Sequence, residues 1–326
     1  MADILSTFPF FELPGKALSN VVRCMDLPEF LCLSLISYKS QQLVKSLNID
    51  SQISSIHVTD EVVITLYDFH HFYFVWDYDY PENLEVVEKI PDENGFEGFR
   101  NEGLMILTEE GFNLGHWMSH LQSILIEPEI QVVSLYSIPA PVDAQWFFNS
   151  ITGSGIKYLA IHESFSVKEC RPLLPFVKEL DMYNGPSKDI LIQNFDCLTI
   201  QRTQLSLDEY LIMNSSHIIT ESWNVSEKLL NRFFKHWMRG SNPRLRYIKF
   251  NAPYQHRLNV EKILNGINHQ ALPETHVQIF NLDLICSERT EVRGGYNFYR
   301  NDGTRATLTI RPYCRTGFIV SLYVWH

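Results

Sequence analysis

The chain of 326 residues has no segment that would place it in a membrane or mark it for export. No run of about 18 uncharged apolar residues occurs, so no membrane-spanning helix is expected. Residues 1–9 contain neither a basic segment nor a long apolar one, which argues against a secretory signal peptide. We therefore expect an intracellular protein, in the cytoplasm, the nucleus or both.

Cysteine is scarce and is not spaced for redox or zinc chemistry. The six cysteines lie far apart without a Cys-x-x-Cys pair, and we expect buried, reduced thiols. Glycine-rich phosphate loops and the Gly-x-Ser-x-Gly turn are also absent. We expect no catalytic residues, no cofactor and no enzyme activity. An enzyme whose active site is assembled from distant residues is an alternative.

One pair of histidines has a spacing that could hold a metal ion. His116 and His120 lie four residues apart in a predicted helix, so both rings would share one face. The glutamate of the His-Glu-x-x-His motif is missing, and no third ligand is indicated. We interpret both histidines as partly exposed helix residues and expect no metal.

Basic residues are outnumbered, 27 Lys and Arg against 38 Asp and Glu, for a net charge of −11. An acidic chain repels phosphate groups, so we expect neither nucleic acid nor a membrane as a partner. Eleven acidic residues and only two basic ones lie between residues 77 and 110. This stretch is predicted to be a solvated loop.

Hydrophobic residues make up 45% of the chain, and their spacing divides it into three parts. Residues 8–50 are predicted to form three short apolar helices, which cannot bury their surface alone. Residues 51–111 are predicted to hold a β-hairpin around a turn near residues 68–71, followed by the acidic loop. Residues 112–326 alternate helices with short strands and end in antiparallel strands around Asn301-Asp302-Gly303.

The strands of the third part share a pattern of large apolar residues. It reads Ile156-x-x-Leu159-x-Ile161 in one strand and recurs as Val177-x-x-Leu180-x-Met182. Further copies begin at Phe195 and Leu245, with a partial copy at Val132. This spacing is typical of a loose leucine-rich-like repeat, in which stacked units form a curved sheet. An ordinary α/β domain is the alternative.

Two segments resemble those of a known family. Leu13-Pro14, Met25-Asp26 and Ile36-Ser37 fill the characteristic places of an F-box, although Ser40 stands where tryptophan is common. Residues 231–245 resemble the hallmark of the F-box-associated type 2 domain, and residues 300–307 resemble its C-terminal signature. The chain is thus similar to nematode-type F-box proteins. The implied fold is α+β: a three-helix F-box, then a leucine-rich-repeat-like α/β domain with flanking antiparallel β-hairpins.

The resemblance implies a substrate-recognition subunit of a Skp–cullin–F-box ubiquitin ligase. The F-box would bind the Skp adaptor and through it cullin, and residues 112–326 would bind an unknown protein target. The expected adaptor-binding residues are apolar: Leu13, Pro14, Val22, Met25, Phe30, Leu31 and Leu35. Ser40 leaves open a ligase-independent binding protein, whose F-box is only structural.

A cluster of cations is the candidate for target binding. Arginine clusters bind acidic or phosphorylated peptides through paired hydrogen bonds. A solvated helix face, with its late cations near the helix C-terminus, is the simpler interpretation. The candidate residues are Arg232, Lys235, Arg239, Arg244 and Arg246.

Overall fold

The fold is known from a computed structural model of the 326 residues. It describes residues 10–25, 27–47, 49–59, 62–67, 71–76, 83–88, 105–127, 129–136, 145–163, 165, 168–183, 185–222, 225–252, 258–284, 287–313 and 317–325. The chain forms two compact units. Unit 1 comprises residues 1–131 and 138–155, and unit 2 comprises residues 132–137 and 156–326. The three-part division into residues 8–50, 51–111 and 112–326 stays a prediction.

Unit 1 begins with a short 3-10 helix, η1 (Phe10–Glu12), and the three helices expected from the sequence. These are α1 (Gly15–Arg23), α2 (Leu27–Ile36) and α3 (Tyr38–Ser46). Helix α3 begins with a reciprocal cap, in which Ser37 Oγ accepts from the Ser40 amide and Ser40 Oγ accepts from the Ser37 amide. This cap satisfies two amides that the first helical turn leaves without partners. It gives Ser40 a structural role at a buried position.

The strands of unit 1 form an antiparallel meander. Strands β1 (Ile49–Val58), β2 (Val62–Tyr67), β3 (His71–Trp76), β4 (Asn83–Glu88) and β5 (Met105–Thr108) pair in this order. The hairpin predicted around residues 68–71 is present, since Tyr67 pairs with His71. Strand β6 (Leu125–Glu127) pairs in parallel with β1. Two helices complete the unit, α4 (Leu114–Ile124) and α5 (Gln145–Ile151).

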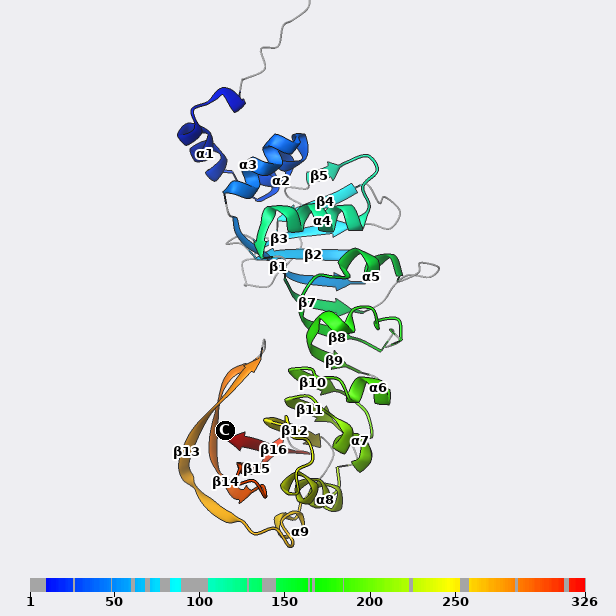
Figure 1. The fold of residues 1–326 in the computed structure, drawn as a ribbon, viewed down its shortest axis with the longest axis vertical. Coiled ribbons are helices and arrows are strands. Elements are labelled where there is room, and N and C mark those ends of the chain that lie inside the picture. Colours follow the sequence, from blue (N-terminus) through cyan, green and yellow to red (C-terminus); the bar gives the residue numbers. More distant parts are fainter. Residues whose placement is uncertain are drawn as a thin grey trace, which may run out of the picture. The chain divides into compact units, whose positions relative to one another are not determined.

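Unit 2 is built on parallel strands that follow one another along the chain (Figure 1). They are β7 (Ile130–Leu135), whose residues from 132 onward belong to this unit, β8 (Ile156–Ile161), β9 (Val177–Met182), β10 (Cys197–Ile200), β11 (His217–Glu221) and β12 (Tyr247–Ala252). The repeated pattern is kept in register, because Leu159 pairs with Leu180 and Leu180 with Leu198. This row continues through Ile218 to Ile248. The recurring apolar residues therefore form one continuous buried row.

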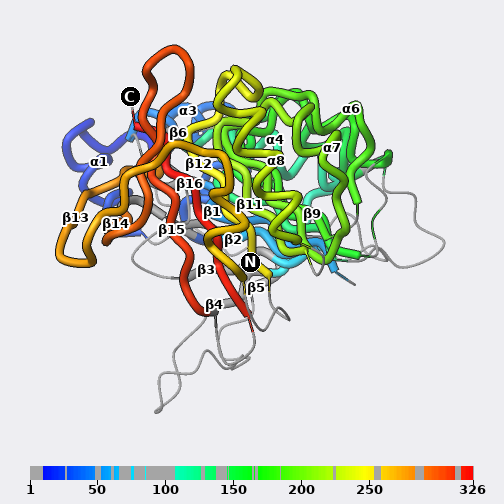
Figure 2. The backbone as a smooth tube through the Cα atoms, turned by 90° about the horizontal axis from the view of Figure 1, so that it is seen from below, coloured from blue at the N-terminus to red at the C-terminus, as the bar shows by residue number. Residues whose placement is uncertain are grey.

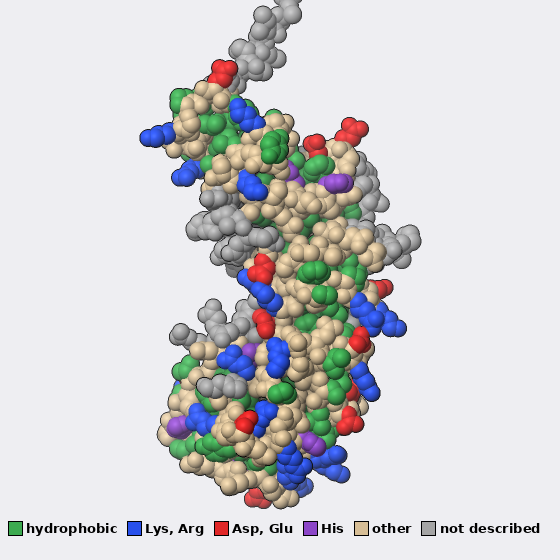
Figure 3. Space-filling model, in the orientation of Figure 1, with side chains coloured by type: hydrophobic (Ala, Val, Ile, Leu, Met, Phe, Trp, Pro, Cys, Tyr) green, Lys and Arg blue, Asp and Glu red, His purple; other side chains and the backbone are tan. Residues whose placement is uncertain are grey.

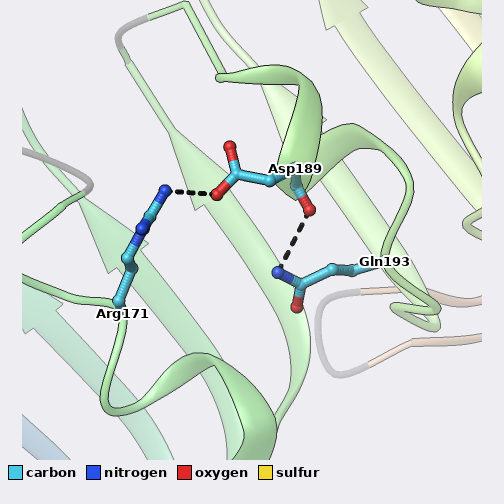
Figure 4. A network of polar contacts seen from close by, with 3 residues as sticks. All are labelled: Arg171, Asp189 and Gln193. Carbon is cyan, nitrogen blue, oxygen red and sulfur yellow. Dashed lines mark hydrogen bonds and ion pairs between the residues drawn. The ribbon is translucent and has the colours of Figure 1, made fainter.

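Helices connect these strands. They are α6 (Lys188–Leu191), α7 (Leu207–Ile212) and α8 (Glu227–Met238), with a 3-10 helix, η2 (Leu174–Phe176), before β9. Figure 4 shows one link between connections: Arg171 donates to the Asp189 carboxylate, and Gln193 Nε2 donates to the Asp189 carbonyl oxygen. Both side chains of this ion pair are about half exposed, so it adds little to stability.

An aromatic cluster fixes α8 to the sheet. The ring centroids of Phe233 and Phe234 in α8 lie 5.7 and 6.4 Å from that of Phe250 in β12. Phe234 and Trp237 also contact Phe298, at 5.9 and 5.8 Å. Because Phe298 belongs to the C-terminal strands, one helix holds both halves of unit 2 together.

The C-terminal strands extend the sheet in antiparallel order. After α9 (Val260–Ile263), strands β13 (Gln270–Leu284), β14 (Ser287–Tyr299), β15 (Arg305–Tyr313) and β16 (Gly317–Trp325) follow. Strand β16 pairs with β12, and β15, β14 and β13 pair outward from it, with β13 at the edge. Figure 2 shows β13 and β14 as the orange part of the tube. The turn predicted at Asn301-Asp302-Gly303 joins β14 to β15.

Two expectations from the sequence are wrong in part. The acidic stretch of residues 77–110 is not only a loop, because β4 and β5 lie in it and pair with each other. Charge counting overlooked the apolar residues between the acids, of which Leu107 is buried. The remainder of the stretch, apart from Glu109 and Glu110, lies outside the described residues. Cys170 and Cys197 are buried, but Cys24 is exposed.

Within the described ranges, no helix is long and apolar enough to span a membrane.

Asn242 supports the turn between α8 and β12, and its loss should destabilise unit 2. Its backbone has a φ of 50°, and its buried side chain donates to the carbonyl oxygens of Tyr210 and Met213, each at 2.9 Å. We expect Asn242→Ala to lower the free energy of unfolding by about 2 kcal/mol or more, since two buried acceptors lose their donor. Urea unfolding followed by circular dichroism measures this change.

The matched control is Asn242→Gly. Glycine adopts a positive φ without strain but donates no side-chain hydrogen bond. Asn242→Gly should therefore lower the free energy of unfolding by less than Asn242→Ala does. Equal stability of wild type and Asn242→Ala would contradict this role.

Candidate functional site

The first candidate surface lies on the helices of unit 1, where large apolar side chains face solvent. Ile36 at the end of α2 is 71% exposed, and Tyr38 at the start of α3 is 77% exposed. Val21 in α1 is 45% exposed. Three such side chains in a segment of 18 residues are unusual for a surface without a partner. We call Val21, Ile36 and Tyr38 the apolar helix face.

The predicted adaptor-binding residues divide into three groups by burial. Val22 and Leu31 have no exposed surface, and they pack the helices together. Pro14 is exposed, and the half-buried residues are Leu13, Met25, Phe30 and Leu35. The adaptor-binding role of all seven stays a prediction. The sequence did not single out Tyr38, because helical periodicity alone does not show which side of an almost wholly apolar segment is buried.

Hydrogen bonds hold these helices on the rest of unit 1. Ser34 in α2 lies 2.7 Å from His120 Nε2 in α4. Gln41 Nε2 in α3 donates to Ser123 Oγ, also in α4, at 2.9 Å. Burial lowers the pKa of His120, so the neutral ring is favoured in this contact. Helices α2 and α3, which carry Ile36 and Tyr38, are therefore fixed to α4.

The second candidate surface lies in unit 2, where β7, β8 and β9 end. Tyr136, His162 and Tyr183 each follow the last residue of a strand, and their rings form a stack. The His162 ring lies 4.0 Å from Tyr136 and 4.7 Å from Tyr183, with interplanar angles of 18° and 23°. Arg202 lies 5.9 Å from the Tyr183 ring and pairs with Glu163 at 2.7 Å. We call Tyr136, His162 and Tyr183 the aromatic stack.

A buried carboxylate lies beside the aromatic stack. Asp181 accepts a hydrogen bond from the Tyr158 hydroxyl at 2.8 Å and from Gln201 Nε2 at 3.0 Å. Burial raises the pKa of the Asp181 carboxyl, although these hydrogen bonds and the nearby His162 act in the opposite direction. Burial also lowers the pKa of His162. The aromatic stack offers ring surfaces, and the polar groups around Asp181 offer hydrogen bonds. This arrangement suits a surface that binds a partner.

The cations predicted to bind the target are spread over α8 and the start of β12. Arg232 and Arg239 are exposed and lie away from the buried face of α8, and Lys235 is half-buried. Arg244 and Arg246 are exposed and precede β12, on either side of the buried Leu245. In Figure 3, Lys and Arg side chains gather over the region that α8 occupies in Figure 1. Nothing tests their binding role, which stays a prediction.

Neither histidine of the His116–His120 pair is placed as a metal ligand. His116 Nδ1 accepts from the Asn113 amide and caps α4, whereas His120 contacts Ser34. Among the described residues, no three His, Cys, Asp or Glu side chains form a group that could hold a metal ion. A cavity of about 620 Å³ opens beside His116, between Trp76 and Asn149. The absence of metal and of catalysis stays a prediction.

Sequence reasoning missed the aromatic stack, although a signal for it is present. Tyr136, His162 and Tyr183 each directly follow the last residue of their strand. The partial copy placed at Val132 is two residues out of register, because β7 begins at Ile130 and its matching copy is Ile130-x-x-Val133-x-Leu135. In that register the residue after each copy is Tyr136, His162 or Tyr183. The buried Asp181 had no such signal, because its partners Tyr158 and Gln201 come from neighbouring strands.

The raised pKa of Asp181 makes stability depend on pH. The folded state binds this proton more tightly than the unfolded state, so the stabilisation is complete below the ordinary carboxyl pKa. It is lost as pH rises through the raised pKa. We expect the free energy of unfolding of the wild type, relative to Asp181→Asn, to fall over this range and then stay constant. Urea unfolding of both proteins between about pH 3 and 7 measures it. A difference independent of pH would refute the assignment.

Comparison with known proteins gives two matches. Residues 187–250, from the N-cap of α6 to Phe250 in β12, match the F-box associated family. The chain is 27% identical over 318 residues to the F-box associated domain-containing protein sdz-33 of Caenorhabditis elegans, an alignment that covers 94% of each chain. No solved structure matches. These matches confirm the resemblance identified in the sequence: residues 187–250 are similar to the F-box associated family, and nearly the whole chain to an F-box associated domain-containing protein.

Proposed function

We propose that this chain is a substrate-recognition subunit of a Skp–cullin–F-box ubiquitin ligase. Helices α1–α3 would act as a three-helix F-box that binds the Skp adaptor, and unit 2 would bind the protein target. The observation that supports this role most directly is the apolar helix face, on a chain similar to F-box associated proteins. Ile36 and Tyr38 are large and more than two-thirds exposed, which is typical of a surface that a partner covers.

The adaptor contact would be driven by burial of apolar area. A few large anchors dominate interfaces of this kind, and near-neutral contacts around them exclude water. Ile36 and Tyr38 are suited to be such anchors, and Val21 belongs to the same three-helix segment. The half-buried Leu13, Met25, Phe30 and Leu35 would complete the surface, while Val22 and Leu31 would keep the helices in place.

Unit 2 would present the target-binding surface. Its parallel strands keep their apolar residues in register, as stacked leucine-rich-like units would, and this supports a repeat-like recognition domain. The chain itself would perform no chemistry. It would hold the target close to a ubiquitin-conjugating enzyme that the cullin recruits, and this proximity would speed ubiquitin transfer. The complex would act in the cytoplasm, the nucleus or both.

One observation favours a second candidate, a ligase-independent binding protein. Ser40, which replaces the tryptophan common in F-boxes, is fully buried and serves the cap of α3. A residue committed to the cap offers no surface to an adaptor. In this alternative, helices α1–α3 would only stabilise unit 1.

Binding of the Skp adaptor separates the two candidates. We expect purified wild-type protein to capture the purified adaptor, and Ile36→Asp or Tyr38→Asp to weaken capture by about tenfold or more, because a charge would be buried in the contact. Both side chains are exposed, so the substitutions should leave the fold intact. Biolayer interferometry with immobilised adaptor measures the affinities.

The matched control is Ile192→Asp, which places the same charge at a 57% exposed isoleucine of unit 2. It should bind the adaptor as the wild type does. Leu31→Asp is unsuitable, since Leu31 is fully buried and its substitution would unfold the helices. Failure of a folded wild type to bind would favour the ligase-independent protein.

A further inference from the structure

Helix α8 of unit 2 carries its basic residues along one face. Residues three or four apart share a helix face, and this spacing links Lys228, Arg232, Lys235 and Arg239, the last at the C-cap. The opposite face holds the aromatic cluster and is fully buried. Three of the four cations are exposed and Lys235 is half-buried, and Lys and Arg side chains gather in this region of Figure 3. We call these four residues the cation stripe.

The cation stripe opposes the stability of the helix that carries it. Lys228 and Arg232 are four residues apart, as are Lys235 and Arg239, and like charges at this spacing repel each other. Lys228 is the second residue of α8, where the positive end of the helix dipole repels a cation. The dipole favours only the cations at the other end. A solvated face that served the helix alone would not combine these placements.

The acids around α8 leave the cation stripe without a counter-charge. Residues 225–250 hold seven Lys and Arg against one acidic residue, Glu227, which accepts from the Asn259 amide at 3.3 Å. Helices α7 and α9 contact α8 and carry Asp208, Glu209 and Glu261, of which Glu209 caps the start of α7. Within the described part of the chain, no carboxylate forms an ion pair with the stripe. Its positive charge is therefore available to a partner.

The packing of α8 fixes the distances between these cations. Because the aromatic side of α8 has no exposed surface, the helix is held against the sheet and binding costs little ordering of the backbone. A rise of about 1.5 Å per residue places Arg232 about 6 Å from Lys228 along the axis, and Arg239 about 10 Å further. An extended peptide advances about 3.3 Å per residue, so acids spaced two and then three residues apart match these intervals.

The exposed side chains of α8 fit carboxylates better than nucleic acid. An arginine guanidinium binds a carboxylate through two parallel hydrogen bonds, and two of the four cations are arginines. Single-stranded nucleic acid is held by base stacking on aromatic rings as well as by charge. Phe233, Phe234 and Trp237 of α8 are all fully buried, so bases would find no such ring on this helix.

We propose that the cation stripe of α8 is the docking site for an extended acidic segment of the target protein. The segment would carry Asp or Glu at three positions, spaced two and three residues apart, opposite Lys228, Arg232 and Arg239. Relief of the repulsion within the stripe would add to the attraction between unlike charges. The identity of the segment's parent as a ligase target rests on the function proposed above.

The test measures binding of a labelled nine-residue peptide to the purified full chain by fluorescence anisotropy. The peptide has Glu at positions 2, 4 and 7 and Ser or Thr elsewhere, and its reversed sequence is tested beside it. We expect saturable binding of one of the two that weakens with added salt. Arg232→Glu should lower the affinity at least about fivefold, because repulsion replaces attraction. Replacing every Glu of the peptide by Gln should abolish binding.

The variant has its own check on folding. Arg232→Glu replaces a repulsion of Lys228 and Lys235 by an attraction, so its urea unfolding midpoint should be no lower than that of the wild type. Lost binding then cannot come from a damaged fold. Arg311→Glu, which reverses the charge of an exposed arginine in β15, is the matched control and should bind the peptide normally.

Four outcomes would overturn the proposal. Neither Glu peptide binds, or binding is unchanged in Arg232→Glu. Alternatively, an oligothymidine binds more tightly than both peptides and loses affinity in Arg232→Glu, which would make nucleic acid the occupant. Finally, sedimentation shows self-association that Arg232→Glu abolishes, which would make the acidic residues of a second copy the occupant.

Adaptor capture by the same proteins separates this test from that of the proposed function. Arg232→Glu should capture the adaptor as the wild type does. A wild type that binds the peptide but not the adaptor would lose the ligase role and keep the docking site.

Discussion

The packing of α8 on the sheet is the interaction on which the rest of unit 2 depends. Phe233 and Phe234 contact Phe250 of the parallel strands, and Phe234 and Trp237 contact Phe298 of the antiparallel strands. Arg300 closes this cluster, since it donates to the Gly240 carbonyl at 2.8 Å and lies 5.7 Å from the Trp237 ring. A second buried cluster also joins the two sets of strands, because Phe280 of β13 packs against Tyr247 of β12, which itself pairs with β16.

The same packing explains why the family resemblance is strongest here. Residues 231–245 resemble the hallmark of the F-box-associated type 2 domain, and their large residues are buried in the aromatic cluster. Arg300 and Asn301 belong to the C-terminal signature, and the Asn301 amide donates to the Met238 carbonyl oxygen at the end of α8. The two signatures therefore contact each other and preserve the fold.

Much of the fold was predictable from the sequence because local spacing carries it. The apolar residues of α1–α3 and the repeated pattern of Leu159, Leu180 and Leu198 identified the helices and parallel strands. Features that depend on distant pairing were not predictable. Strands β4 and β5 were not recognised because acidic residues surround their apolar ones. The aromatic stack forms only when three strands pair in the right register. The exposure of Ile36 and Tyr38 depends on how α2 and α3 pack. The candidate adaptor residues were chosen from a resemblance, which does not distinguish the buried Val22 and Leu31 from exposed contacts.

The central claim is that unit 1 binds a Skp adaptor through apolar burial, and calorimetric titration of the full chain with the purified adaptor at several temperatures tests it most directly. The account predicts saturable binding of one adaptor per chain with a negative heat-capacity change, because Ile36 and Tyr38 leave water on binding. Absence of binding by the folded chain, or binding without a negative heat-capacity change, would contradict it.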